Sequence, residues 1–299
     1  MTDAEYIERL HSQLPALYTK SLSQFAPMWT VIAEAVAVES KKQPRRAILD
    51  LASGSVAEPA CTLAQRFSAV NVVASDNVPE ICEQAAKQVH CLGLSGRVEV
   101  ENIDLASLAA LADQADAAAE APAIDTVTCS LGLFMLPAEQ QTSLLGGIRT
   151  LLSPGGCLIA TVWDQMVLME IGGRVLAKVL GRDPEDSPPM PFAPTSLGNG
   201  EADALLTQAG FDSWGESHNQ VHSLRLDLGP SGADSTWMLG LLPYTGTLVA
   251  LHQQHGVSDV FERARLAFEV EMEAAGHVDE TGFVSISTGL EYRVLSAIK

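Results

Sequence analysis

Apolar and polar positions follow two alternating rhythms over the first 163 residues. Short apolar runs typical of buried strands end on acidic residues or small-residue turns, and they cover residues 47–52, 70–76, 97–104, 124–132 and 156–163. Stretches with helical spacing separate several of these runs, at about residues 58–67, 79–93 and 137–152. Such alternation predicts an α/β fold with a parallel, doubly wound sheet, whose ligands bind at the carboxyl ends of the strands.

The remaining segments predict helices with few strands. Residues 1–46 have helical spacing, and further helices are expected at about 165–180, 201–210, 235–256 and 258–275, with a proline-rich linker at 184–194. The closing EYRVLSAIK predicts a last strand. We therefore expect four parts: an N-terminal helical segment (1–46), a cofactor-binding core (47–163), a substrate lid region with the remaining sheet elements (164–285) and a final strand (286–299).

Charge and cysteine content exclude several classes of function. The chain of 299 residues carries 37 acidic and 18 basic side chains, a formal net charge of −19, which disfavours nucleic acid and anionic membranes as partners. The one basic cluster, at residues 41–46, is expected to be a solvated segment. No apolar run approaches 18 residues and the N-terminus lacks a signal core, so neither a membrane span nor secretion is expected. The 5 cysteines form no CxxC pair and indicate small core residues in a reducing cytoplasm, without a metal site.

Candidate chemistry gathers where the predicted strands end. ILDLASGSV places Asp50 before a turn of small residues around Gly54, which lets the backbone approach a ligand closely. Asp76 ends the second strand in VVASDNVPEICEQA, where a carboxylate can accept hydrogen bonds from both hydroxyls of a ribose. Asp104 ends the third strand, CSLGLF leaves the fourth, and SPGG precedes the fifth.

These segments resemble, in order and spacing, the motifs of class I S-adenosylmethionine-dependent methyltransferases. The resemblance rests on ILDLASGSV, SDNVPEICEQA, VEVENIDL, IDTVTCSLGLFMLP and IRTLLSPGGCLIATVW, over about residues 47–163. Within that superfamily the chain looks like the small-molecule type of the ubiquinone and menaquinone methyltransferases. The resemblance implies a Rossmann-like, mostly parallel seven-stranded sheet with a helical lid insertion. It also implies S-adenosylmethionine as cofactor and methyl transfer to a small organic acceptor.

The same resemblance implies cofactor-binding residues. Asp76, with Asn77 beside it, would hold the ribose, and Asp104, with Ile103 or Leu105, would meet the adenine. The turn from Ala52 to Gly54 would pass under the methionine part, with Asp50 behind it, and Cys129 and Ser130 would offer backbone groups to the cofactor's amino group. Carboxylates suit this cofactor electrostatically, because it carries a sulfonium and an ammonium. Asp50 is also compatible with a simple capping or turn role, and Asp76 with a simple helix N-cap.

Two departures from the family pattern leave alternatives open. Ala52 and Val56 stand where the family has glycine; the alanine disfavours positive φ and the valine is stiff. A catalytically silent relative with a binding or regulatory role is therefore one alternative. A nicotinamide-dependent oxidoreductase is another, disfavoured because no GxGxxG turn is present. A nucleic-acid amino-methyltransferase is disfavoured by SLGLF after the fourth strand.

The acceptor site is harder to predict, because it falls in the less recognisable half. Helices at 165–180 and 235–275 would form a lid, and the expected substrate-binding residues are Tyr18, Phe134, Trp163, Trp237 and Tyr244, although core packing explains them equally well. His252 and His255, three apart on a helix, are weak candidates for a general base, and no third ligand accompanies them for a metal. The Glu-rich stretch 262–273 is expected to be a solvated helix face, and the protein a monomer or homodimer.

Overall fold

The computed structural model describes residues 3, 5–6, 21–110, 124–183, 193–255 and 259–299, except for the side chains of residues 254–255. The chain divides into two compact units, which we describe separately. The sheet unit comprises Ala26–Asp164, Phe192–His222 and Tyr292–Lys299. The helical unit comprises Met1–Phe25, Gln165–Pro191 and Ser223–Glu291. Residues 192–222 belong with the sheet unit. The four-part division expected from the sequence, which groups them in a lid region that includes the remaining sheet elements, remains a proposal.

The sheet unit is built on a mostly parallel sheet in the order β3-β2-β1-β4-β5-β10-β6, with β7 also paired to β10. Its strands are β1 (Ala47–Leu51), β2 (Asn71–Asp76), β3 (Val98–Asn102), β4 (Ile124–Ser130), β5 (Leu152–Met166), β6 (Ser213–Trp214), β7 (Val221–Ser223) and β10 (Leu290–Ile298). The pairs among the first five strands are parallel, and β6 runs antiparallel to β10. The doubly wound α/β sheet predicted from the alternating pattern is confirmed, with β7 as an eighth strand.

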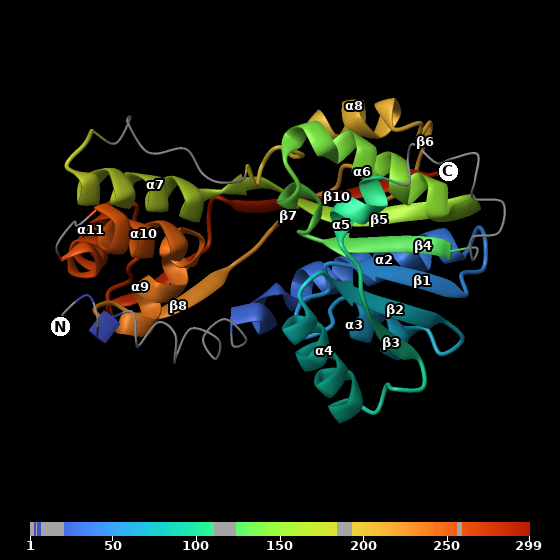
Figure 1. Ribbon diagram of the computed structural model, residues 1–299, viewed down its shortest axis with the longest axis horizontal. Coiled ribbons are helices and arrows are strands. Elements are labelled where there is room, and N and C mark those ends of the chain that lie inside the picture. Colours follow the sequence, from blue (N-terminus) through green and yellow to red (C-terminus); the bar gives the residue numbers. More distant parts are fainter. Residues whose placement is uncertain (1–2, 4, 7–20, 111–123, 184–192, 256–258) are drawn as a thin grey trace. The chain divides into compact units, whose positions relative to one another are not determined.

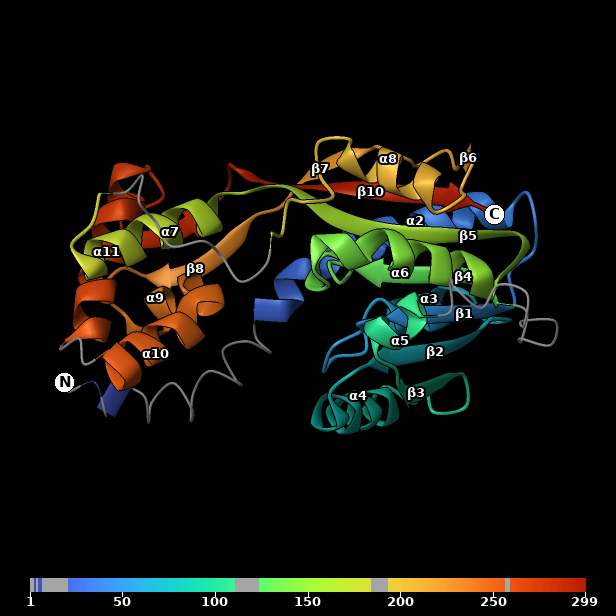
Figure 2. The same ribbon diagram turned by 45° about the horizontal axis from the view of Figure 1, so that its top comes forward.

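Helices cover both faces of this sheet (Figures 1 and 2). They are α2 (Ala26–Ser40), α3 (Ala60–Arg66), α4 (Pro79–Cys91), α5 (Leu105–Ala109), α6 (Ala138–Leu151) and α8 (Glu201–Gln208). Side chains of α2, α3 and α4 share one buried cluster with the sheet, whereas α6 packs against α5 and α8. Burial on both faces explains why the central strands are apolar runs without strict alternation.

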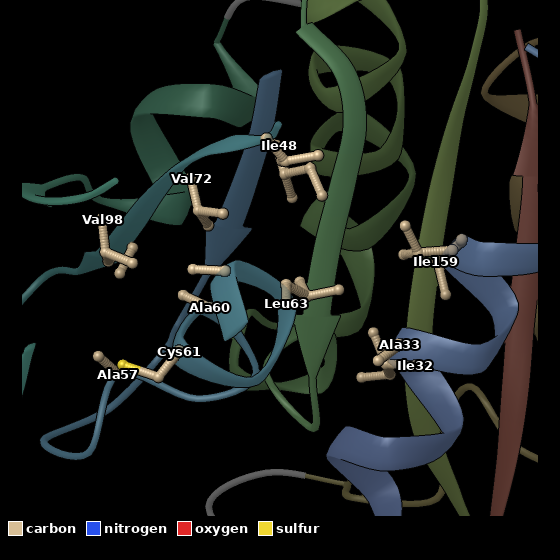
Figure 3. Close-up of a cluster of buried hydrophobic side chains, with 14 of the residues drawn as sticks. Ile32, Ala33, Ile48, Ala57, Ala60, Cys61, Leu63, Val72, Val98 and Ile159 are labelled. Atoms are coloured by element: carbon tan, nitrogen blue, oxygen red, sulfur yellow. The ribbon is translucent and has the colours of Figure 1, made fainter. Parts of the chain in front are cut away.

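A cluster of buried hydrophobic side chains forms a core in the sheet unit (Figure 3). The strand residues Ile48, Val72 and Ile159 belong to the same cluster as Ile32 of α2 and Leu63 of α3, and all are at most 2% exposed. Burying aliphatic side chains of this size contributes about 1.5–3 kcal/mol each, which makes this cluster a principal source of stability.

Two cysteines depart from the expectation of small core residues. Cys61, Cys129 and Cys157 are buried, as predicted, but Cys82 is half-buried and Cys91 is exposed. Both lie on α4, which ends at Cys91. The prediction was wrong there because it treated all five thiols alike, whereas α4 is amphipathic and turns part of its surface to solvent.

The expectation of a solvated basic segment before β1 is wrong for Arg45. Its side chain is 6% exposed, and Nη1 donates to the carbonyl oxygens of Asp125 and Gly155, each at 3.0 Å. Asp125 also accepts hydrogen bonds from the backbone N–H groups of Arg46 and Ala47. Arg45 is buried because it joins the beginning of β4 to the turn in β5, and these backbone partners are invisible in a sequence pattern.

The helical unit combines helices with a small antiparallel sheet. It contains α7 (Val167–Leu180), β8 (Leu226–Pro230), α9 (Asp234–Gly240), α10 (Thr245–His255), α11 (Val260–Ala274) and β9 (Phe283–Ile286). Strands β8 and β9 form a two-stranded antiparallel sheet. The helix expected at 235–256 is two helices, separated by a 3₁₀ turn at Leu242–Tyr244. Pro243 accounts for the break, because proline lacks the N–H that a continuous helix needs.

Glu271 corrects the expectation of a solvated Glu-rich face on α11. Its carboxylate lies 2.6 Å from both Arg174 Nε and Lys178 Nζ on α7, and these partners hold its pKa below the usual range despite burial. The two helices are therefore joined by a charged contact as well as by apolar packing. No helix in the described ranges is long and apolar enough to cross a membrane.

Candidate cofactor site

Parallel pairing brings the predicted cofactor residues to one edge of the sheet unit. β1 lies between β2 and β4, with Asp50 opposite Ala74 on one side and Thr128 on the other. The loops that leave these strands are therefore neighbours. The turn at residues 52–54 begins there, close to Asp76 and to the exit of β4.

The turn after β1 is held in a left-handed conformation. Ala52 has φ of 53° and Gly54 has φ of 64°. Ser53 N–H donates to the carbonyl oxygen of Ser75 at 2.8 Å, and Gly54 N–H donates to Asp76 Oδ2 at 3.3 Å. A side chain at residue 54 would meet open space, so the absence of one leaves backbone accessible to a ligand.

Ala52 adopts the positive φ that its side chain disfavours, at a cost of about 1–2 kcal/mol. Its methyl group is accommodated by Gly132, in the loop after β4. A Cβ atom placed on Gly132 would lie 2.7 Å from Ala52 Cβ and 2.7 Å from Cys129 Sγ. The glycine missing at position 52 is thus compensated by a glycine on the neighbouring strand exit.

Asp50 is completely buried beneath this turn. Its Oδ1 accepts from Thr128 Oγ1 at 2.6 Å, and its Oδ2 accepts from Ser53 Oγ at 2.6 Å and from Ala60 N–H at 3.2 Å. Burial raises the pKa of Asp50 to about 7, against the opposing effect of the hydroxyl hydrogen bonds. Because both oxygens are used by the protein, Asp50 shapes the turn rather than facing a ligand.

Asp76 is half-buried at the end of β2 and connects two loops. Oδ1 accepts from Val78 N–H at 3.1 Å, beside the Gly54 contact of Oδ2. These bonds use only part of the accepting capacity of a carboxylate, which has about four lone-pair positions. Asp76 therefore retains room for the hydroxyls of a ribose, and the exposed Asn77 follows it directly.

The exit of β3 lies next to Asp76. Ile103 is half-buried, and its N–H donates to the carbonyl oxygen of Asp76 at 3.0 Å. Asp104 is exposed and caps α5, with Oδ1 accepting from Ala106 N–H at 3.1 Å, while Leu105 is buried. Capping uses one oxygen of Asp104 and leaves the other for a ligand.

The exit of β4 contributes backbone and little reactive chemistry. Cys129 is buried, and desolvation raises the pKa of its thiol to about 12, so it is not a thiolate nucleophile. Ser130 Oγ lies 3.3 Å from Thr161 Oγ1 on β5. Leu131 has φ of 58°, a second left-handed residue, and Phe134 is buried. Two strained residues at adjacent strand exits are typical of functional loops.

The other predicted residues are divided between the units. Trp163 is buried in the sheet unit. Trp237 and Tyr244 are buried in the helical unit, where Tyr244 donates its hydroxyl to the Met169 carbonyl oxygen and the Trp237 ring lies 5.6 Å from that of Tyr6. These contacts are those of core residues, so a role for Trp237 and Tyr244 in acceptor binding stays a prediction.

The candidate bases are also in the helical unit. His252 Nδ1 lies 2.9 Å from Asp3 Oδ2, in an ion-pair contact if the imidazole is protonated. Tyr18 and the side chain of His255 lie outside the described residues. Within the described ranges no group of three His, Cys, Asp or Glu residues could hold a metal.

One polar network near the end of β5 was missed in the sequence. Arg293 on β10 contacts Asp164 through Nε at 2.9 Å and Nη2 at 2.5 Å, and Asp164 Oδ1 also accepts from Asn199 N–H at 2.9 Å. All three residues belong to the sheet unit, and Asp164 is its last residue on β5. An acid after the fifth apolar run was the only available signal, since its partner is 129 residues away.

Comparisons with known proteins support the fold. No family model matches the sequence, and no curated protein does. The solved structure of a "putative sarcosine dimethylglycine methyltransferase" from Galdieria sulphuraria is 14% identical, with 92% of this chain and 86% of that chain covered and a TM-score of 0.50. An O-methyltransferase family protein from Burkholderia thailandensis is 20% identical, with 67% of this chain covered and a TM-score of 0.44. The match spans about half, 52%, of the Burkholderia chain.

The fold is that of the class I S-adenosylmethionine-dependent methyltransferases, as the resemblance of the sequence implied. A likeness at this level of identity establishes the fold alone, because one fold supports many activities. The activity must be argued from the site.

Proposed function

We propose that this protein is an S-adenosylmethionine-dependent methyltransferase that acts on a small organic acceptor. The observation that carries the proposal is the position of Asp76. Its carboxylate is anchored to the open turn at Gly54 by one oxygen and to the start of α4 by the other. A carboxylate that can accept hydrogen bonds from ribose hydroxyls therefore lies beside an accessible backbone turn, which supports the proposal.

The charges and the free space at these strand ends suit S-adenosylmethionine. Asp76 ends β2 and Asp104 follows the neighbouring strand β3, and the described part of the chain forms no ion pair with either. Carboxylates without partner cations favour a ligand that carries positive charge. Gly54 leaves space where another residue would project a side chain.

When bound, S-adenosylmethionine supplies an electrophilic methyl group on a sulfonium sulfur. In our proposal Asp76 and Asn77 hold the ribose, and Ile103, Asp104 and Leu105 border the adenine. The backbone from Ala52 to Gly54 and at Cys129 and Ser130 holds the methionine part. The protein's main contribution is to orient the acceptor toward the methyl group, since positioning supplies much of the rate in such displacements.

The acceptor residues remain proposals as well. Phe134 and Trp163 belong to the sheet unit, Trp237 and Tyr244 to the helical unit, and Tyr18 is the fifth candidate. His252 or His255 would remove a proton where the acceptor requires it. The free cysteines and the net charge of −19 favour a cytoplasmic protein with no nucleic-acid partner, as a monomer or homodimer.

The silent-relative alternative loses part of its support. It was motivated by Ala52 and Val56, and the methyl group of Ala52 is accommodated against Gly132. We find no observation that favours the oxidoreductase alternative.

Calorimetric titration of Asp76→Ala tests the proposal. We expect affinity for S-adenosylmethionine to fall tenfold to a hundredfold, or about 1.5–3 kcal/mol, because hydrogen bonds to a charged group are lost. Glu99→Gln is the control, since it removes an exposed carboxylate from the adjacent strand β3 and should leave affinity unchanged. Unchanged affinity in a folded Asp76→Ala protein would refute the ribose assignment.

A further inference from the structure

Asp50 lies in a buried cluster of acidic and thiol groups under the turn at residues 52–54. Its three hydrogen-bond donors, Ser53 Oγ, Thr128 Oγ1 and Ala60 N–H, are all neutral. In the described part of the chain Asp50 forms no ion pair. An ionised carboxylate here is stabilised by hydrogen bonds alone.

The titratable side chains that interact electrostatically with Asp50 are themselves acids: one carboxyl group and two thiols. Glu58, in the loop before α3, adds electrostatic repulsion, and the thiols of Cys61 on α3 and Cys129 on β4 interact with the same carboxylate. On β2, Ser75 Oγ donates to the Asp50 carbonyl oxygen, and the next residue is Asp76. Among the described residues, no ion pair balances the negative charge that Asp50 carries when it is ionised.

We infer that Asp50 is a specificity-determining residue: its ionised form favours the sulfonium of S-adenosylmethionine over the uncharged thioether of S-adenosylhomocysteine, so this preference depends on proton binding at Asp50. The inference rests on the proposed function, which places the turn at residues 52–54 under the methionine part of the cofactor.

The physical reason is the charge difference between the two ligands. They share an adenosine and an amino-acid group, and they differ at sulfur by one methyl group and one unit of charge. In a poorly solvated interior, a charge acts over a longer range than it does in water. Burial raises the pKa of Asp50 to about 7, so near neutral pH the carboxyl is partly protonated before the ligand arrives. A cation bound nearby stabilises the ionised form and releases the proton.

The inference predicts both a change of preference and a proton count. If ionisation of Asp50 favours the sulfonium about tenfold, the preference for S-adenosylmethionine over S-adenosylhomocysteine rises about fivefold between pH 6 and pH 8. The same strength of coupling releases about 0.4 proton when S-adenosylmethionine binds at pH 7, and less when S-adenosylhomocysteine binds.

The test is calorimetric titration with both ligands at pH 6, 7 and 8, in pairs of buffers with different ionisation enthalpies. The pairs of buffers give the number of protons released, independently of any methyl transfer. The wild-type protein is compared with Asp50→Asn and with Asp125→Asn. The second variant is the matched control, because it removes a carboxylate from the opposite end of β4. Glu58→Gln serves as a further variant if Asp50→Asn does not fold, and it should shift the rise in preference to lower pH by removing repulsion from Asp50.

The expected result is a preference that rises with pH in wild type and Asp125→Asn and stays flat in Asp50→Asn. A flat preference in wild type, with no proton release, would overturn the inference while leaving the proposed function intact. An equal rise in Asp50→Asn would also overturn it, by assigning the effect to another group. If neither ligand binds at any pH, the proposed function itself is wrong.

Discussion

The contact between Ala52 and Gly132 allows a quantitative test of how the cofactor turn is built. Gly132 has φ of −100°, which any residue adopts, so the cost of Gly132→Ala arises from contact alone. The new Cβ would lie 2.7 Å from both Ala52 Cβ and Cys129 Sγ, and atoms must move to relieve this. Overpacking of this kind costs about 1–3 kcal/mol of unfolding free energy.

A double-mutant cycle separates the contact with Ala52 from other effects. Ala52→Gly removes about 1–2 kcal/mol of left-handed backbone strain from the folded state. It also makes folding less favourable by roughly 0.5–1 kcal/mol, because the unfolded chain with glycine has more conformational entropy to lose. The two effects oppose each other, so this substitution alone changes the unfolding free energy modestly. It also removes one of the two close contacts that Gly132→Ala creates. We therefore expect Gly132→Ala to cost about 1 kcal/mol less when residue 52 is glycine.

Urea unfolding of the four proteins, with m-values compared, measures this coupling. Gly96→Ala is the control, because a Cβ at Gly96 would meet nothing within 4 Å. If Gly132→Ala costs no more than Gly96→Ala, the close contact does not exist. If Gly132→Ala lowers the unfolding free energy equally with alanine and with glycine at position 52, the claim that Gly132 makes room for the Ala52 methyl group is wrong.

Two further predictions concern buried charge in the sheet unit. Arg293→Ala leaves Asp164 buried without its bidentate partner, and we expect urea unfolding to show a loss of about 2–4 kcal/mol; a loss below about 1 kcal/mol would contradict the ion pair. Burial raises the pKa of Asp50 from 3.8 to about 7, so the folded protein retains a proton that the unfolded chain releases. Asp50 therefore contributes stability that is complete below about pH 4 and is lost as the pH rises through about 7. The stability of wild type relative to Asp50→Asn should fall over this range by an amount on the order of 4 kcal/mol, and a difference independent of pH would contradict it.

The sheet and its acidic strand ends were predictable because they follow from local patterns. Buried parallel strands are apolar runs, and the residues that follow each run lie at the carboxyl edge of the sheet. Asp76 and Asp104 could be placed at that edge from the sequence, and their role in binding the cofactor remains a proposal. Asp50 was placed correctly at the end of β1, but the direction of its side chain depends on Thr128 and Ala60, which only the folded chain brings to it.

What the sequence could not provide depends on pairs that are distant along the chain. Asp164 and Arg293 are 129 residues apart, and neither stands out in its local context. Arg45 is buried because two backbone carbonyls reach it. Ala52 suggests an unfavourable turn when considered alone, and only the folded chain shows that Gly132 leaves room for its methyl group.

The central claim is that the strand ends around Asp76 hold S-adenosylmethionine. A crystal structure of the protein grown with S-adenosylhomocysteine tests it most directly. We predict density for the ligand at the ends of β1, β2 and β4, with both ribose hydroxyls on the Asp76 carboxylate and the methionine part over the turn at residues 52–54. Ligand density elsewhere, or none at saturating concentration, would contradict the account.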